Sequence, residues 1–180
     1  LAAAPDGTPW GITNLGRVFR LEGRSWRQVL GATASDIAIG PDGRVVVADA
    51  KGLLSEYDSD TGRFDRIDGH GVLVAAGPRG ALWTVSQDTR FVQDCATTPC
   101  QALRRKARSI AVGPDGSLWI VSDRERLLRF DAGARTFARV ETPGHTPRRV
   151  AVGPKGYPWV VTDKDVVLAS AFFDAPTADV

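Results

Sequence analysis

Apolar residues occur along the chain in short segments, and polar turns separate these segments at intervals of about 8–12 residues, as in all-β folds. Some segments are uniformly apolar and small, such as 37–39 and 110–112, whereas others alternate apolar and polar residues, such as 136–140. No stretch keeps the period of an amphipathic helix. The pattern therefore predicts an all-β protein.

One turn signature recurs five times at nearly regular spacing. A proline, a charged residue and a glycine stand at 5–7, 41–43, 78–80, 114–116 and 154–156. Successive prolines are 36, 37, 36 and 40 residues apart, which indicates tandem structural repeats. Proline presets φ and glycine accepts a positive φ, so each signature predicts a tight turn between two strands.

A fixed apolar position lies five residues after each signature proline. Its occupants are Trp10, Val46, Trp83, Trp119 and Trp159. Mid-strand positions of constant phase are core positions, so these side chains are predicted to be buried between neighbouring sheets. The remaining tryptophan, Trp26, lies on a later alternating segment, and there the sequence leaves burial and exposure open.

Each repeat resolves into four short predicted strands, of which the first is small and apolar and the last alternates. This gradient fits a β-propeller blade, whose first strand lies near the crowded axis and whose last has one face in water. We predict one β-propeller domain over residues 1–180, made of four-stranded antiparallel blades. The approximate repeats are 1–31, 32–69, 70–106, 107–144 and 145–180. An open β-solenoid is the alternative, although solenoid coils are usually shorter than ~36 residues.

The first residues, Leu1 to Ala4, align with the first strand of a later repeat, Ile110 to Gly113. The chain is therefore expected to begin inside a strand. Either residues precede Leu1 in the full protein or another segment completes the first repeat. Both cases allow the five repeats to be part of a larger propeller.

Composition narrows the function classes. The net charge is only +2, which disfavours a dedicated nucleic-acid binder. No apolar run reaches the ~18 residues of a membrane span. The basic cluster at 104–108 is expected to form a solvated loop between repeats. Cys95 and Cys100 lie close enough for a local disulfide, which indicates an extracytoplasmic, secreted or periplasmic location, although two reduced cytosolic thiols would give the same sequence.

Residues 9–43 carry a denser motif. They read Pro-Trp-Gly-Ile-Thr-Asn-Leu-Gly-Arg-Val-Phe-Arg, then Ser-Trp-Arg-Gln-Val, then Ser-Asp-Ile-Ala-Ile-Gly-Pro-Asp-Gly. This motif resembles the tectonin family of β-propeller repeats. Later repeats depart from it, because Val46 replaces a tryptophan and Phe64 and Phe137 stand where the first repeat has Trp26. These later repeats also resemble the propellers of streptogramin lyases and of bacterial sensor proteins.

The resemblance implies a non-enzymatic, lectin-like module that binds a cell-surface glycan or lipopolysaccharide. The alternative is a protein-interaction scaffold or a subunit of a larger assembly. A lyase-like enzyme that uses His70 and His145 is a weaker alternative, because the two histidines are two repeats apart and no acidic partner recurs beside them. No nucleophile motif or phosphate loop is present. We therefore expect no catalytic residue, cofactor or metal, and we assign the signature aspartates Asp6, Asp42 and Asp115 to turn chemistry rather than calcium binding.

A four-stranded meander places the turns between second and third strands on the same face as the linkers between blades. This face varies from repeat to repeat and includes Asp88, whereas the proline–glycine turns are nearly uniform. Because recognition usually falls to variable loops, we predict the binding surface here. The predicted ligand-binding residues are Asn14, Lys51, His70, Arg108, Arg124, His145, Arg148 and Lys164.

Overall fold

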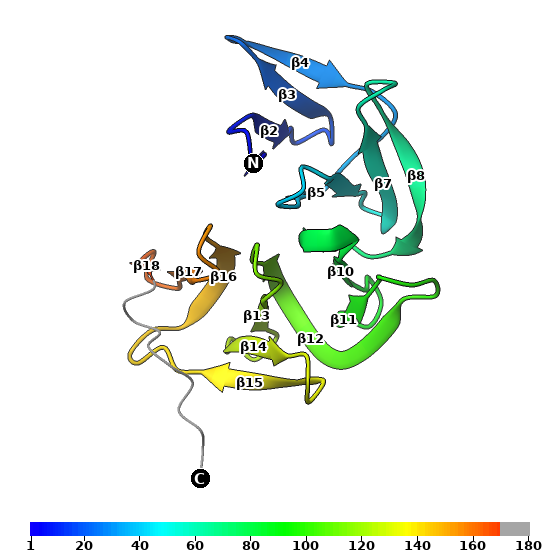
Figure 1. Cartoon of the computed structure of the whole chain (residues 1–180). Coiled ribbons are helices and arrows are strands. Elements are labelled where there is room, and N and C mark those ends of the chain that lie inside the picture. The colour runs from blue at the N-terminus through cyan, green and yellow to red at the C-terminus, as the bar shows by residue number, and fades with distance from the viewer. Residues whose placement is uncertain (170–180) are drawn as a thin grey trace.

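The computed structural model describes residues 1–169; residues 170–180, the end of the fifth predicted repeat, lie outside the described part. The regular secondary structure of the described chain is almost entirely antiparallel sheet, and its single helical segment is the 3-10 turn η1 (Pro78–Gly80). The sheets follow one another along an arc, with their first strands toward the centre and their last strands at the periphery (Figure 1). The predicted β-propeller class is confirmed.

The first two blades are separate four-stranded meanders. Blade 1 consists of β1 (Ala2–Ala3), β2 (Pro9–Ile12), β3 (Val18–Glu22) and β4 (Ser25–Val29). Blade 2 consists of β5 (Asp36–Ile39), β6 (Val45–Ala48), β7 (Leu53–Asp58) and β8 (Arg63–His70).

The next two blades share one long strand. Blade 3 consists of β9 (Leu73–Ala76), β10 (Leu82–Val85), β11 (Phe91–Asp94) and the first part of β12 (Gln101–Val112). Blade 4 consists of the second part of β12, β13 (Leu118–Ser122), β14 (Leu127–Asp131) and β15 (Thr136–Val140). Blade 5 is described as β16 (Pro147–Val152), β17 (Pro158–Thr162) and β18 (Val167–Leu168).

The shared strand corrects one expectation. The basic cluster at 104–108, expected in a loop, lies inside β12. The chain crosses from blade 3 to blade 4 without leaving the extended conformation, and register shifts in both pairings absorb the change of direction. The cluster is nevertheless largely solvated, because Arg104, Arg105, Lys106 and Arg108 are all exposed.

The aspartates of the proline–glycine turns accept hydrogen bonds within their own turns, as the sequence predicts. The backbone N–H of Thr8 donates to Asp6 Oδ1 at 2.8 Å, and the N–H of Ser117 donates to Asp115 Oδ1 at 3.1 Å. Hydrogen bonds from the backbone and hydroxyl of Thr8 hold the pKa of Asp6 below its usual value. Cys95 and Cys100 form the predicted disulfide, which closes the loop between β11 and β12.

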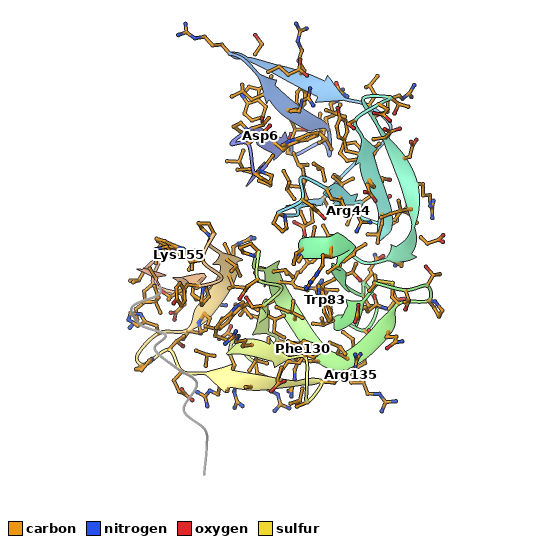
Figure 2. The ribbon with its side chains drawn as sticks, in the orientation of Figure 1. Asp6, Arg44, Trp83, Phe130, Arg135 and Lys155 are labelled. Carbon is orange, nitrogen blue, oxygen red and sulfur yellow. A yellow bond between two sulfur atoms is a disulfide. The ribbon has the colours of Figure 1, made fainter. Side chains whose placement is uncertain are left out.

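The cores lie between neighbouring blades, and the aligned position of the second strand supplies much of them. Trp10, Val46 and Trp119 are buried there, and Trp83 is partly buried beside Phe130 of blade 4 (Figure 2). Trp159 is 50% exposed, so its predicted burial is wrong. The equivalent tryptophans are covered by the blade that follows, whereas Trp159 faces away from blade 4, the neighbour on which Val160 packs.

Candidate binding surface on the turn rim

Hydrogen bonds join the turns between second and third strands to the linkers between blades; we call this combined surface the turn rim. The N–H of Ala34 donates to the carbonyl of Gly16 at 2.8 Å, and the N–H of Gly71 donates to the carbonyl of Gly52 at 2.9 Å. Blades 3 and 5 have comparable bonds, from Ala107 N–H to Arg90 O at 3.0 Å and from Asp163 N–H to Thr146 O at 2.9 Å. On the rim that these bonds hold together, Asn14, Lys51 and Arg124 are exposed, whereas His145 is partly buried.

The structure brings two of the predicted binding residues together. One carboxylate oxygen, Glu125 Oε1, accepts from Arg108 Nη1 at 2.9 Å and from Arg148 Nη1 at 2.8 Å. Arg108 also donates through Nη2 to the carbonyl of Asp123 at 3.0 Å. The three side chains come from β12, the β13–β14 turn and β16, so the cluster spans blades 4 and 5.

The cluster is both charged and accessible. Its two arginines and one glutamate sum to one positive charge. The side chains of Arg108 and Arg148 are 38% and 47% exposed, so each guanidinium keeps N–H donors on its solvent side. A carboxylate or phosphate group of a ligand fits these planar donors in a bidentate manner.

Glu125 reaches this position through an unusual backbone conformation. The turn residue that is Gly16 in blade 1 and Gly52 in blade 2 has a positive φ, and Glu125 has φ 58° in blade 4. Non-glycine residues seldom adopt this region. The side chain that replaces glycine here is the one that holds both arginines.

The other predicted residues are distributed around the rim. Arg124 and His145 line one hollow beside Glu125, between the β13–β14 turn and the linker that enters blade 5. His70 packs its ring on Gly52, next to Lys51 in the β6–β7 turn. Asn14 and Lys164 lie in the corresponding turns of blades 1 and 5. The eight residues are therefore one local cluster plus separate positions, not one pocket.

The first strands of all five blades line one pocket on the inner side of the arc. Asp36, Arg108 and Arg149 are the charged residues that line it. The carboxylate of Asp36 accepts from the N–H of Val74 in blade 3 at 2.9 Å. Burial raises the pKa of Asp36, although this hydrogen bond and the positive charges of the amino terminus and Arg149 oppose the rise.

Sequence reasoning missed Glu125, Arg149 and Asp36. For Glu125 a signal existed, because it stands where the first two repeats have glycine in the same turn. The sequence did not indicate that Glu125 pairs with two arginines, since Arg108 and Arg148 lie 17 and 23 residues away along the chain. Arg149 and Asp36 lie on first strands, which the sequence assigned to packing.

The two histidines lie far apart in the arrangement of the blades. His70 ends β8 and His145 precedes β16, so blades 3 and 4 separate the two histidines. Within residues 1–169, no group of three or more His, Cys, Asp or Glu side chains is placed to hold a metal ion. In the same range no helix is long and apolar enough to cross a membrane.

Comparisons with known proteins agree with this architecture. A family model described as the tectonin domain matches residues 1–101. No curated protein sequence matches the chain. Among solved structures, the β-propeller domain of Cps50 (Swd1) from Myceliophteria thermophila is similar with a TM-score of 0.72 at 13% identity. That match covers 93% of this chain, which spans 62% of the Cps50 domain.

Two propeller enzymes are also similar in fold. Virginiamycin B lyase from Staphylococcus aureus has a TM-score of 0.65 at 16% identity, with 100% of this chain and 70% of the lyase covered. The gluconolactonase XC5397 from Xanthomonas campestris has a TM-score of 0.66 at 16% identity, with 91% and 71% covered. Identities this low show a shared fold and carry no activity across.

Proposed function

This chain belongs to the tectonin family, and from that premise we propose that it is a non-enzymatic binding module that recognises a cell-surface glycan or lipopolysaccharide through its turn rim. The propeller fold itself supports a binding or scaffold role in general. The ligand class rests on the chemistry of the rim. The disulfide is compatible with an extracytoplasmic site of action, where such ligands occur.

The observation that carries the proposal is the Arg108–Glu125–Arg148 cluster. Glu125 neutralises one of the two guanidinium charges and fixes both groups at hydrogen-bonding distance. Donors held in place before binding lose less conformational entropy when a ligand arrives. Phosphate groups of lipopolysaccharide and carboxylate groups of acidic glycans are suitable acceptors for such a pair.

The non-enzymatic part of the proposal rests on the histidines. His70 ends β8 and His145 precedes β16, so blades 3 and 4 lie between the two histidines and keep them from acting as one acid–base pair. His70 packs on Gly52, and the backbone carbonyl of His145 accepts from the hydroxyl of Thr142 at 2.9 Å.

A glycan and lipopolysaccharide array tests the proposal. The double variant Arg108→Ala with Arg148→Ala is expected to lose most binding, because the cluster changes from one positive charge to one negative charge. Unfolding free energy should fall by no more than about 1 kcal/mol, since exposed ion pairs contribute little. The matched control is Arg27→Ala with Arg66→Ala, which removes the same charge from the exposed outer strands β4 and β8.

Unchanged binding in the rim variant, or an equal loss in the control, would contradict the assignment of this surface. Failure to bind any glycan or lipopolysaccharide, together with stable co-purification of a protein, would favour the scaffold alternative. That alternative has its own support, because Trp26 and Trp159 are 48% and 50% exposed.

A further inference from the structure

A hollow of about 490 Å³ lies beside the Arg108–Glu125–Arg148 cluster on the turn rim. One wall is the β13–β14 turn with the start of β14, and the other is the end of β15 with the linker that leads to β16 (Figure 1). Its volume is within the range of sites that hold small ligands. We call it the blade 4 hollow, and its lining residues are 124–127 and 139–146.

Hydrogen bonds fix both walls of the blade 4 hollow. In the turn, the N–H of Glu125 donates to the carbonyl of Ser122 at 3.0 Å, and the N–H of Arg126 donates to the hydroxyl of the same serine at 3.2 Å. In the linker, the N–H of His145 donates to the carbonyl of Thr142 at 3.0 Å, and the hydroxyl of Thr142 donates to the carbonyl of His145 at 2.9 Å. The backbone around the hollow is therefore ordered before a ligand arrives, which lowers the cost of binding.

Arginines dominate the charged lining of the blade 4 hollow. Arg139 is paired, since its Nη2 lies 3.0 Å from Glu141 Oε2. Arg124 and Arg126 are exposed, and within residues 1–169 neither guanidinium is joined to a carboxylate by an ion pair. Glu125, which stands between them in the sequence, is already bonded to the two arginines of the neighbouring cluster. Two guanidinium groups at the hollow therefore keep donors for a ligand.

A larger hollow on the opposite face shows a contrasting arrangement. It measures about 920 Å³, lies beside the proline–glycine turns of blades 1 and 2, and is lined by two arginines and four carboxylate residues. Arg20 donates to Glu22 at 2.6 Å and Arg44 donates to Glu56 at 2.8 Å, so both arginines have internal partners. An anionic ligand would meet an excess of negative charge there. The blade 4 hollow instead has three arginines and two glutamates.

We propose that the blade 4 hollow is a second anionic subsite and that the ligand is a glycan with two anionic groups on neighbouring sugars. This inference rests on the proposed function, because it extends the same surface. The cluster binds one group through Arg108 and Arg148, and the hollow binds the second through Arg124 and Arg126. Because Arg124, Glu125 and Arg126 are consecutive residues, the two subsites adjoin. The ligand class is thereby narrowed from an anionic glycan to a doubly charged one.

Calorimetric titration with defined sugars tests the second subsite. The probes are a diglucosamine with one phosphate and the same disaccharide with a phosphate on each sugar. The wild type should bind the doubly phosphorylated probe at least about tenfold more tightly, because a further hydrogen-bonded charge pair supplies this factor. The variant Arg124→Ala with Arg126→Ala should lose this preference and bind both probes about as tightly as the wild type binds the singly phosphorylated one.

Two further double variants separate the two subsites from a general effect of charge. Arg108→Ala with Arg148→Ala should weaken binding of both probes, because it removes the first subsite. Arg105→Ala with Lys106→Ala removes the same charge from exposed positions of β12 and should leave the tenfold preference unchanged. All three variants should unfold at similar temperatures, since every substituted side chain is exposed.

Sialic acid and disialic acid, which carry one carboxylate on each sugar, distinguish an acidic glycan from a phosphorylated one. If disialic acid binds more tightly than the doubly phosphorylated probe and loses more affinity in the Arg124→Ala with Arg126→Ala variant, the ligand is of the carboxylate type. The opposite order indicates phosphates, as in lipopolysaccharide. Either result supports the second subsite.

Two results would overturn the second subsite. They are equal affinity of the wild type for singly and doubly charged probes of both kinds, and a preference that persists in the Arg124→Ala with Arg126→Ala variant. In both cases, a loss of binding in Arg108→Ala with Arg148→Ala would leave the proposed function standing. A wild type that binds none of the sugars would contradict the proposed function and this inference together.

Discussion

Asp36 links the first strands of blades 2 and 3 through a single side chain. Its carboxylate accepts the N–H of Val74, and in blade 4 the neutral hydroxyl of Ser109 accepts the N–H of Val150 in the same way, at 3.1 Å. A neutral acceptor is therefore sufficient to bond the first strand of the next blade at this position. The negative charge of Asp36 costs stability in the pocket between the first strands, because burial disfavours the ionised form.

We predict that Asp36→Asn stabilises the protein at neutral pH. The pKa of Asp36 is raised in the folded state, so folding favours the protonated form. The wild type therefore loses stability as the pH rises from the usual aspartate pKa through the raised value, and the asparagine variant lacks this loss. Thermal unfolding at several pH values should show similar midpoints in acid and a higher midpoint for the variant at pH 7. A lower midpoint at neutral pH would mean that the carboxylate charge is required.

The interfaces between blades explain why residues at equivalent positions of the repeat differ in solvent exposure. Trp119 and Trp159 follow the same turn signature by the same number of residues. Blade 5 covers Trp119 with Val150, Val160 and Leu168, and leaves it 5% exposed. Trp159 faces the other flank of blade 5. Burial at this position is a property of the neighbouring blade rather than of the strand itself.

We predict a large difference between two matched substitutions. Trp119→Ala should lower the unfolding free energy by about 3–5 kcal/mol, as other large-to-small core changes do. Trp159→Ala should cost clearly less, because half of its surface already contacts water. Chemical denaturation at a concentration where both variants are monomeric measures the two costs. Equal costs would show that Trp159 is packed as tightly as Trp119.

The sequence predicts the features of each blade, but it does not predict what the neighbouring blade covers. The turn signature and the aligned apolar position were sufficient to predict the blades, and the spacing of Cys95 and Cys100 was sufficient to predict their disulfide, because these features depend on local sequence. The exposure of Trp159 was not predictable, since it depends on which blade lies beside it. The continuous strand β12 was missed for a related reason: a basic, strongly polar segment gives little β signal by itself.

The assembled propeller completes a charge cluster that no single blade contains in full. Arg108 and Glu125 meet within blade 4, and the packing of blade 5 on blade 4 brings Arg148 to the same carboxylate. The predicted binding residues were thus selected for their type and for the face they share, whereas their grouping required the tertiary structure. The chain carries a net charge of only +2, so any attraction for an anionic ligand has to be local.

We predict that Glu125→Gln strengthens binding of an anionic glycan or lipopolysaccharide. The glutamine carbonyl oxygen remains an acceptor for Arg108 and Arg148, while the charge of the cluster rises from one to two. The gain should be largest at low ionic strength and should shrink as salt is added, because screening acts over about 10 Å at 0.1 M. Titration of the ligand at several salt concentrations, beside the double arginine variant, measures both effects. Weaker binding by Glu125→Gln at low salt would show that the carboxylate takes part in recognition rather than competing with the ligand for the two arginines.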